Sequence, residues 1–276
     1  MLEDKAQGKT EYENTSHQTA SPAQIDNNKA APSASRESGG EKNTQQSLST
    51  RDLLRLMEFA IFRKQNDSFD VLHLAQLDAS LVSARYYQQR MLKARNFPND
   101  LEHLSFALAE SPLTGLVLEF GVASGRTLNH IAQKRNMQTI YGFDVFTGLP
   151  ETWRTGFEAG AFARTGFPLV RENCRLIPGL FEDTLPSFRI KNPGDIAFIH
   201  VDCDLYSGTR AILENCRDGI KPGTVICFDE YFNYPGYEQH EFKAWKQFCE
   251  ANGVEYEYLG FVSSHQQVSV RVLSIS

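Results

Sequence analysis

The amino-acid sequence predicts an α/β protein with a mostly parallel seven-stranded sheet, helices on both faces and an N-terminal helical extension. Two observations carry this prediction. From Gly115 onward, short continuous apolar runs alternate with stretches of helical periodicity, as in a parallel sheet that is covered on both faces. The last two apolar runs are joined by Ser263-Ser264-His265, which predicts a terminal antiparallel hairpin.

The first 48 residues differ in composition from the rest. Residues 1–48 are rich in Ser, Gln, Asn, Ala, Lys and Glu, and Tyr12 is their single aromatic residue. They cannot bury enough surface to offset the entropy of ordering, so we expect a disordered tail, with a docking or regulatory segment as the alternative. We then expect a helical segment over 49–113 that packs on the core, and the main domain over 114–276.

Helical signals precede the main domain. Ser49-Thr50-Arg51-Asp52 resembles a capping box, and apolar residues follow it at helical spacing. Further helices are expected over 81–95, with Tyr87 and Met91 on one face, and over 100–110.

Within the main domain, apolar runs predict the seven strands. They cover 116–120, 138–143, 174–178, 196–201, 224–228, 254–261 and 267–274. Helices are expected over 125–135, 208–218 and 239–252.

Composition narrows the class of protein. A net charge of −6 and a pI near 5.7 argue against a nucleic-acid partner, because such surfaces need a basic patch. The five cysteines form no Cys-x-x-Cys pair, which favours buried, reduced thiols in a cytoplasmic protein over a zinc site or disulfides. No signal peptide, transmembrane run or membrane partner is expected. The oligomeric state stays open, with a homo-oligomer as one alternative.

The first strand of the main domain leads into a glycine loop. The strand carries Glu119 near its end and runs into Gly121, Ser124 and Gly125 before a helix begins. Glycine lets a backbone approach a ligand closely. The spacing Glu-x-Gly-x-x-x-Gly differs from the dinucleotide pattern Gly-x-Gly-x-x-Gly. We expect these four residues to bind a cofactor, with packing of a strand-to-helix turn as the alternative.

The next two strand ends extend this prediction. Asp144 ends the second strand, where a Rossmann-type fold hydrogen-bonds a ribose hydroxyl, although an acid there could also cap its own loop. Gly179, Phe181 and Asp183 follow the third strand and are expected beside the adenine end of the cofactor, with an ordinary loop or a helix cap as the alternative.

Carboxylates gather at two further strand ends. One strand runs through His200 into Asp202 and Asp204, and another ends at Asp229 and Glu230. If these strands are neighbours, their ends lie about 5 Å apart. The carboxylates would then repel one another unless a cation or the hydroxyls of a substrate neutralise them. Hard oxygen ligands suit Mg²⁺ or Ca²⁺. The alternative is that Asp204 and Glu230 form salt bridges with residues such as Arg210.

Together these motifs resemble the macrocin O-methyltransferase family of class I S-adenosylmethionine (SAM)-dependent methyltransferases. The resemblance covers about residues 114–272. It rests on Glu119 to Gly125, Phe143 to Pro150, Gly179 to Pro186, His200 to Tyr206 and Phe228 to Tyr231, which occur in the family's order. It implies a Rossmann-like fold, a SAM cofactor, an acceptor hydroxyl on a sugar or natural product, and a divalent metal.

The resemblance also implies roles for individual residues. Asp202 matches the family's first metal aspartate, and Asp229 and Glu230 match its paired carboxylates, for which Mg²⁺ is the expected ion. The sequence departs from the family in carrying Asp-Glu where characterised sugar methyltransferases carry Asp-Asp, and in a Gly- and Phe-rich insert over 155–168. Leu205 stands where catechol-type enzymes carry a lysine base, which weakens that interpretation.

The sequence therefore predicts a SAM-dependent O-methyltransferase that acts on a small-molecule hydroxyl with metal assistance. Asp202 is the expected general base, with Asp204 and His200 as alternatives. Tyrosines in the loop 231–241 either stack on the acceptor or are buried rings of a rigid loop. An NAD(P)-dependent oxidoreductase and a catalytically silent binding protein on the same fold are the alternative functions.

Overall fold

The computed structural model describes residues 51, 54–55, 58, 64–65 and 68–276. The expected tail, the Ser49–Asp52 capping box and most of the helix predicted after it lie outside these residues. The first strands described, β1 (Lys64–Gln65) and β2 (Ser68–Phe69), pair as a short antiparallel ladder.

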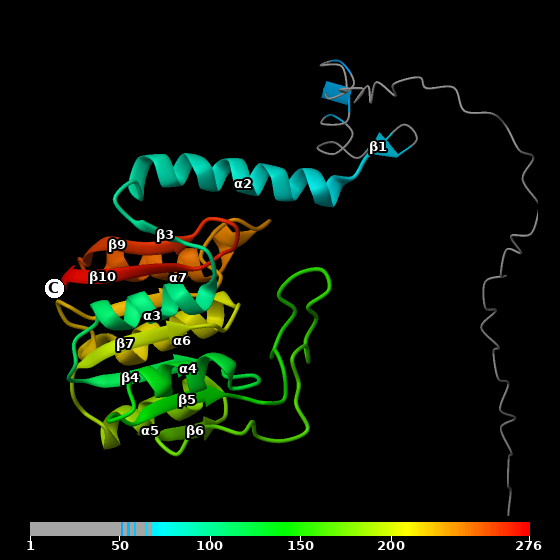
Figure 1. Cartoon of the computed structure of the whole chain (residues 1–276). Helices are drawn as coiled ribbons and strands as arrows, with labels where there is room; N and C mark the ends of the chain where they lie inside the picture. The colour runs from blue at the N-terminus through cyan, green and yellow to red at the C-terminus, as the bar shows by residue number, and fades with distance from the viewer. Residues whose placement is uncertain (1–50, 52–53, 56–57, 59–63, 66–67) are drawn as a thin grey trace, which may run out of the picture. The chain divides into compact units, whose positions relative to one another are not determined.

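The core is one sheet of eight strands in the order β3-β9-β10-β8-β7-β4-β5-β6 (Figure 1). Its strands are β3 (Arg95–Phe97), β4 (Leu116–Phe120), β5 (Ile140–Asp144), β6 (Cys174–Pro178), β7 (Ile196–Val201), β8 (Val225–Phe228), β9 (Glu255–Val262) and β10 (Val268–Ser274). The pairs are parallel except for those that β10 makes with β8 and β9, so the predicted terminal hairpin is confirmed.

The eighth strand replaces part of a predicted helix. The helix expected over 81–95 is α2 (Val71–Arg90), which begins where Asp70 accepts from two backbone N–H groups and ends before Met91. The next residues form β3, whose Arg95 pairs with Gly260 of β9. Helical periodicity could not reveal this boundary, because the pairing partner is distant in sequence.

Helices cover both faces of the sheet (Figure 1). The helices α3 (Asp100–Glu110) and α4 (Arg126–Lys134) pack on one face. The other face is covered by α5 (Phe181–Lys191), α6 (Tyr206–Cys216) and α7 (Glu241–Ala251), and two 3₁₀ turns cover Arg217–Gly219 and Tyr237–Gln239. The predicted fold class, with an α/β sheet buried between two helical layers, is confirmed.

The helix α5 was not predicted. A proline lies inside it at position 186, where it removes a backbone donor, and no side chain caps the helix start. A helix with an internal proline and without a capping residue lacks the usual sequence signals of a helix. In the helix, Asp183 lies in the first turn on the exposed surface, where a carboxylate favours the helix dipole.

The strand order creates a switch point between β4 and β7. The chain proceeds from β4 to β5 and β6 on one side and from β7 to β8 on the other. Ligands of open α/β sheets bind at the carboxyl ends of the strands at such a point. None of the helices described in the structure is long and apolar enough to cross a membrane.

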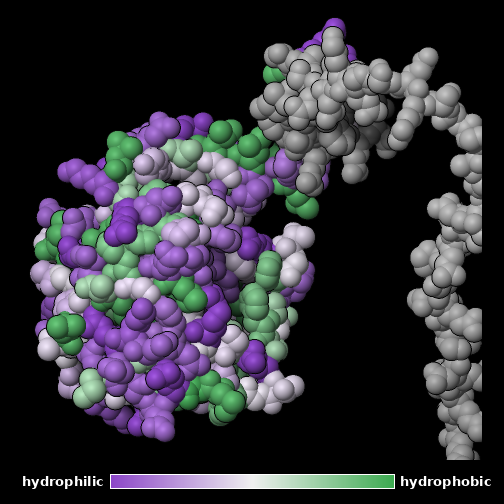
Figure 2. Space-filling view, viewed as in Figure 1, coloured by the Kyte–Doolittle hydropathy of each residue, from purple (hydrophilic) through white to green (hydrophobic). Residues whose placement is uncertain are grey.

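A long loop over 145–173 projects beside these strand ends (Figure 1). It contains the predicted insert and is tied to itself by Gly160 N–H, which donates to the Leu149 carbonyl at 2.8 Å. Figure 2 shows hydrophobic residues along this projecting loop. Two of the apolar side chains of the loop are largely exposed, namely Phe167 (63%) and Leu169 (95%). We call residues 145–173 the lid loop.

Candidate active site

A cavity of about 660 Å³ opens at the carboxyl ends of the central strands. Eight of the predicted site residues line it, namely Gly121, Asp144, Gly179, Phe181, Asp202, Asp204, Asp229 and Glu230. Five do not: Glu119, Ser124, Gly125, Asp183 and His200. The topology therefore brings the cofactor motif and the acid motif to one cavity, although five of the predicted residues are not among those that line it.

Gly121 is required by the contact between two strand ends. Its φ is +93°, and a Cβ there would lie 1.5 Å from the carbonyl oxygen of Asp202. The sequence motif suggests that glycine here leaves space for the cofactor, whereas the nearest obstacle is the backbone of the neighbouring strand. The glycine loop and Asp202 are therefore in direct backbone contact.

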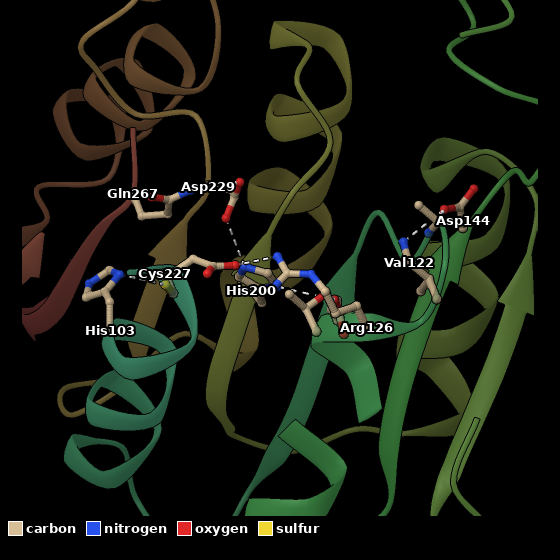
Figure 3. A network of polar contacts seen from close by, with 12 residues as sticks. His103, Val122, Arg126, Asp144, His200, Cys227, Asp229 and Gln267 are labelled. Carbon is tan, nitrogen blue, oxygen red and sulfur yellow. Dashed lines mark hydrogen bonds and ion pairs between the residues drawn. The ribbon is translucent and has the colours of Figure 1, made fainter. Parts of the chain in front are cut away.

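Asp144 holds the glycine loop in place. One of its carboxylate oxygens accepts from the backbone N–H groups of Val122 and Ala123, both at 2.8 Å, and the other accepts from Phe146 N–H at 2.6 Å (Figure 3). Ala123 itself has a positive φ of 42°. The acid caps its own loop and also lines the cavity, so the two alternatives drawn from sequence are compatible.

Glu119 lies behind the cavity. It is fully buried, and Oε1 accepts hydrogen bonds from the Thr127 hydroxyl and from His200 Nδ1, the latter at 3.3 Å. The opposite ring nitrogen, His200 Nε2, lies 3.9 Å from Asp229 Oδ1 (Figure 3). A buried chain Glu119–His200–Asp229 thus supports one of the predicted metal ligands, and Glu119 is not placed to touch a cofactor in the cavity.

The two carboxylates beside His200 favour the protonated form of its imidazole ring. Burial alone would lower the pKa of His200, but its contacts with Asp229 and Glu119 raise it well above the usual value. Burial likewise works to raise the pKa of Asp229, yet His200 and a hydrogen bond from Gln267 lower it. Asp229 is therefore the member of the acidic cluster that is held ionised.

Asp202, Asp229 and Glu230 form a compact set of oxygen ligands. One carboxylate oxygen from each lies within 4.8 Å of the others. Burial and the charge of Asp229 raise the pKa of both Asp202 and Glu230 well above the usual range. Glu230 Oε2 is buried and has no hydrogen-bond partner among the described residues. The donor chemistry and the orphaned oxygen fit a hard divalent cation.

Asp204 completes the acidic wall in a strained conformation. It has a φ of +65°, unusual for a residue with a Cβ, and Leu205 N–H closes a tight turn onto the Cys203 carbonyl at 2.6 Å. Burial and the charge of Asp229 raise the pKa of Asp204 to about 7. Arg210 pairs with Glu214 on its own helix instead, so the structure does not support the alternative of a salt bridge from Arg210 to Asp204 or Glu230.

Several site residues gave no sequence signal. Glu241, in the first turn of α7, is fully buried and accepts the Glu230 N–H at 3.0 Å, and Gln267 comes from the terminal hairpin. The lid loop supplies Trp153, Arg154 and Phe157 to the cavity wall. Only the Gly- and Phe-rich composition of the insert hinted at this contribution.

The tyrosines of the loop 231–241 are buried rather than exposed to an acceptor. Tyr231, Tyr234 and Tyr237 are at most 3% exposed and pack on one another and on Phe242. The second of the two sequence interpretations, a rigid loop with buried rings, therefore describes this segment.

Comparison with known proteins finds methyltransferases. Residues 118–231 match the family described as "Methyltransferase domain". A segment of 70 residues is 39% identical to 8-demethyl-8-(2,3-dimethoxy-alpha-L-rhamnosyl)-tetracenomycin-C 4'-O-methyltransferase of Streptomyces olivaceus, covering 25% of each protein. A segment of 117 residues is 26% identical to demethyldecarbamoylnovobiocin O-methyltransferase of Streptomyces niveus, covering 36% of this chain and 44% of that protein. The matched segments span less than half the length of either relative.

Solved structures share the fold. The calicheamicin methyltransferase CalS11 superposes with a TM-score of 0.51 at 22% identity, over 86% of this chain and 99% of that chain. The O-methyltransferase NovP gives a TM-score of 0.50 at 20% identity, over 63% of this chain and 79% of that chain. The resemblance drawn from the sequence motifs is confirmed by the domain match and the named relatives.

Proposed function

We propose that the protein is a SAM-dependent O-methyltransferase of small-molecule hydroxyls, with a sugar or other natural product as acceptor, since residues 118–231 match the family described as "Methyltransferase domain". One observation carries the proposal: the glycine loop with Asp144 and the carboxylate set of Asp202, Asp229 and Glu230 line the same cavity.

The cofactor half of the cavity is built around β4, β5 and β6. In the proposed complex the loop after Gly121 holds the methionine end of SAM. Asp144, which already accepts three backbone N–H groups, accepts a further hydrogen bond from a ribose hydroxyl. Gly179 and Phe181 border the adenine end, because they follow β6 and line the same cavity. SAM supplies the methyl group, bound to a sulfonium whose positive charge suits an acid-lined cavity.

The acceptor half is built around β7 and β8. Asp202, Asp229 and Glu230 would hold one Mg²⁺-like ion, which supplies Lewis-acid chemistry that lowers the pKa of a bound hydroxyl. The residues of the chain do the remaining work. Asp229, held ionised by His200, provides a permanent charge, and Asp202 and Asp204 are within the same wall to take a proton.

The proposed reaction is an in-line displacement. An acceptor oxygen about 3 Å from the methyl carbon forms the O–C bond as the S–C bond breaks, and the bonding pair goes to sulfur. The hydroxyl proton passes to Asp202, or to Asp204 in the alternative assignment.

The test is a labelling experiment on the full-length protein. Isothermal titration with S-adenosylhomocysteine (SAH) is expected to show one site, and SAM with a labelled methyl group should pass its label to a metabolite in a small-molecule extract. Mass spectrometry of the product identifies the acceptor. If the protein binds NAD(P) and not SAH, the oxidoreductase alternative replaces this proposal.

A further inference from the structure

Arg154 is the single arginine or lysine among the residues that line the cavity. Seven carboxylate residues line the same cavity, namely Asp144, Glu151, Glu182, Asp202, Asp204, Asp229 and Glu230. None of these acids forms an ion pair with Arg154 in the described part of the chain. Neutralising one of these acids in an ion pair is therefore not the role of Arg154.

Aromatic rings fix the position of the Arg154 guanidinium. Its central carbon lies 3.9 Å from the ring centre of Trp153, 4.9 Å from that of Tyr234 and 5.0 Å from that of Phe157. Contacts of this kind hold a guanidinium by its faces and leave its N–H edge free to donate. Trp153 and Phe157 belong to the lid loop, whereas Tyr234 belongs to the loop after β8, so Arg154 bridges the two sides of the cavity.

One donor of the Arg154 guanidinium, the buried Nε, lacks an acceptor among the described residues. A buried donor without a partner destabilises the protein unless a ligand supplies the acceptor. The ligand that matches a fixed guanidinium fork is a planar or tetrahedral oxyanion, which accepts two parallel N–H bonds.

We propose that Arg154 binds an oxyanion, a carboxylate or phosphate, carried by the methyl acceptor. The inference rests on the proposed function and deepens it, because it assigns the acceptor to the class of anionic small molecules. The lid loop then acts as the specificity element: it sets the anionic group of the acceptor at one end of the cavity and its hydroxyl at the carboxylate set.

The position of Arg154 favours the acceptor over the carboxylate of the cofactor. Its ring partner Tyr234 follows β8, and its charge acts on Asp204 after β7, so both neighbours belong to the acceptor half. The lid loop is also joined to that half by Ser207, whose hydroxyl donates to Glu151 at 2.7 Å. None of these contacts involves the glycine loop.

The test uses the fluorescence of Trp153, one of only two tryptophans in the chain, which lies against the Arg154 guanidinium. Full-length protein saturated with SAH is titrated with pyrophosphate and, separately, with glucuronate at constant ionic strength. Glucose is the neutral control. We expect a saturable change with at least one oxyanion, weakened about tenfold or more in Arg154→Gln, and no change with glucose. Arg164→Gln, an exposed arginine of the same loop outside the cavity, should behave as wild type.

The remaining outcomes are decisive. The relative affinities of pyrophosphate and glucuronate show which oxyanion the site takes. No saturable response to either probe, or an equal response in Arg154→Gln, overturns the proposal. Displacement of SAH by the oxyanion, followed by calorimetry, would assign Arg154 to the cofactor and also overturn it. Because SAH binding is measured in the same samples, its absence identifies a failure of the proposed function instead.

Discussion

The two halves of the cavity are built on opposite principles. At the ends of β4 and β5, both oxygens of Asp144 accept backbone N–H groups, so the loop is fixed before any ligand arrives. At the ends of β7 and β8, carboxylates crowd together, and Glu230 Oε2 and Glu241 Oε1 are buried without partners among the described residues.

This difference in hydrogen bonding indicates different tasks for the two halves, namely cofactor binding for the Asp144 loop and methyl transfer for the carboxylates after β7 and β8. A loop with satisfied hydrogen bonds binds its ligand without reorganisation, which suits a cofactor that is the same in every turnover. Buried, mutually repelling carboxylates are costly in the free protein, and this cost is relieved by a cation or a proton. The first half should therefore control affinity for SAM, and the second should control turnover.

The sharpest test is Asp202→Asn. We expect turnover to fall about 100-fold or more, because the proposal makes Asp202 both a metal ligand and the base that accepts the hydroxyl proton. SAH affinity should stay near the wild-type value. The metal-free variant should unfold at a higher temperature than wild type, because asparagine removes the cost of burying an acid whose pKa the fold raises well above its usual range. Glu182→Gln, an exposed acid that also lines the cavity, is the control and should keep its turnover. Lost SAH binding in Asp202→Asn would show that the halves are not separable.

Gly121→Ala should damage both halves at once. Its Cβ would lie 1.5 Å from the Asp202 carbonyl at a φ of +93°, so the strand ends must part. We expect a loss of about 3 kcal/mol in the free energy of unfolding, measured by denaturant titration. Gly156→Ala shares a positive φ of +87° but meets no atom within 4 Å, so it should cost only about 1 kcal/mol. Equal costs for the two variants would refute the proposed contact.

Asp144→Ala addresses the cofactor half alone. Loss of a carboxylate that holds the loop, and that we propose to bind the ribose, should weaken SAH binding by about 1–3 kcal/mol, measured by calorimetry. Asp183→Ala removes a predicted cofactor residue that the structure places on the exposed surface of α5, and its affinity should be unchanged. Were Asp183→Ala the weaker binder, the assignment of the two acids would be reversed.

Mg²⁺ should stabilise the acceptor half in a pH-dependent way. The pKa values of Asp202, Asp204 and Glu230 are raised in the folded protein, so the folded state holds protons that the unfolded state has lost. Stability of the metal-free protein should therefore fall as the pH rises through about 7, the pKa of Asp204. Mg²⁺ at ten times the dissociation constant measured at pH 8 should restore about 1.4 kcal/mol at pH 8 in thermal unfolding, and the same Mg²⁺ concentration should restore less at pH 6, where protons compete with the ion for the carboxylates. Full turnover after chelation would remove the metal from the proposal.

The smallest effect is expected from removing residues 1–48. Their polar composition contributes to neither half, so the thermal midpoint and SAH affinity should not change. A fall of several degrees in the midpoint would show that this segment packs on the domain.

Sequence patterns located the strands and the acids well. The strands at 116–120, 174–178 and 196–201 match the structure to the residue, because a short apolar run between polar or glycine-containing turns is typical of a strand covered on both faces. Because parallel strands end at one edge, the acids that follow them necessarily meet.

Other features depended on contacts that are remote in sequence. Whether Glu119 faces the cavity or the helix layer is decided by α4, whose Thr127 covers it. The partners of His200 come from two different strands. Arg154 lies in a loop without periodicity, so nothing local could place it against Tyr234.

The strand β3 has a practical consequence for anyone who dissects this protein. It covers the outer edge of β9, which would otherwise present a row of free N–H and C=O groups to solvent. Exposed edges of this kind template intermolecular pairing and aggregation. The match to the methyltransferase family begins at residue 118, beyond β3 and α3. A fragment that begins at residue 118 would keep the carboxylates of the site but expose the edge of β9, so we expect it to aggregate, whereas a fragment that begins before Arg95 keeps this edge covered.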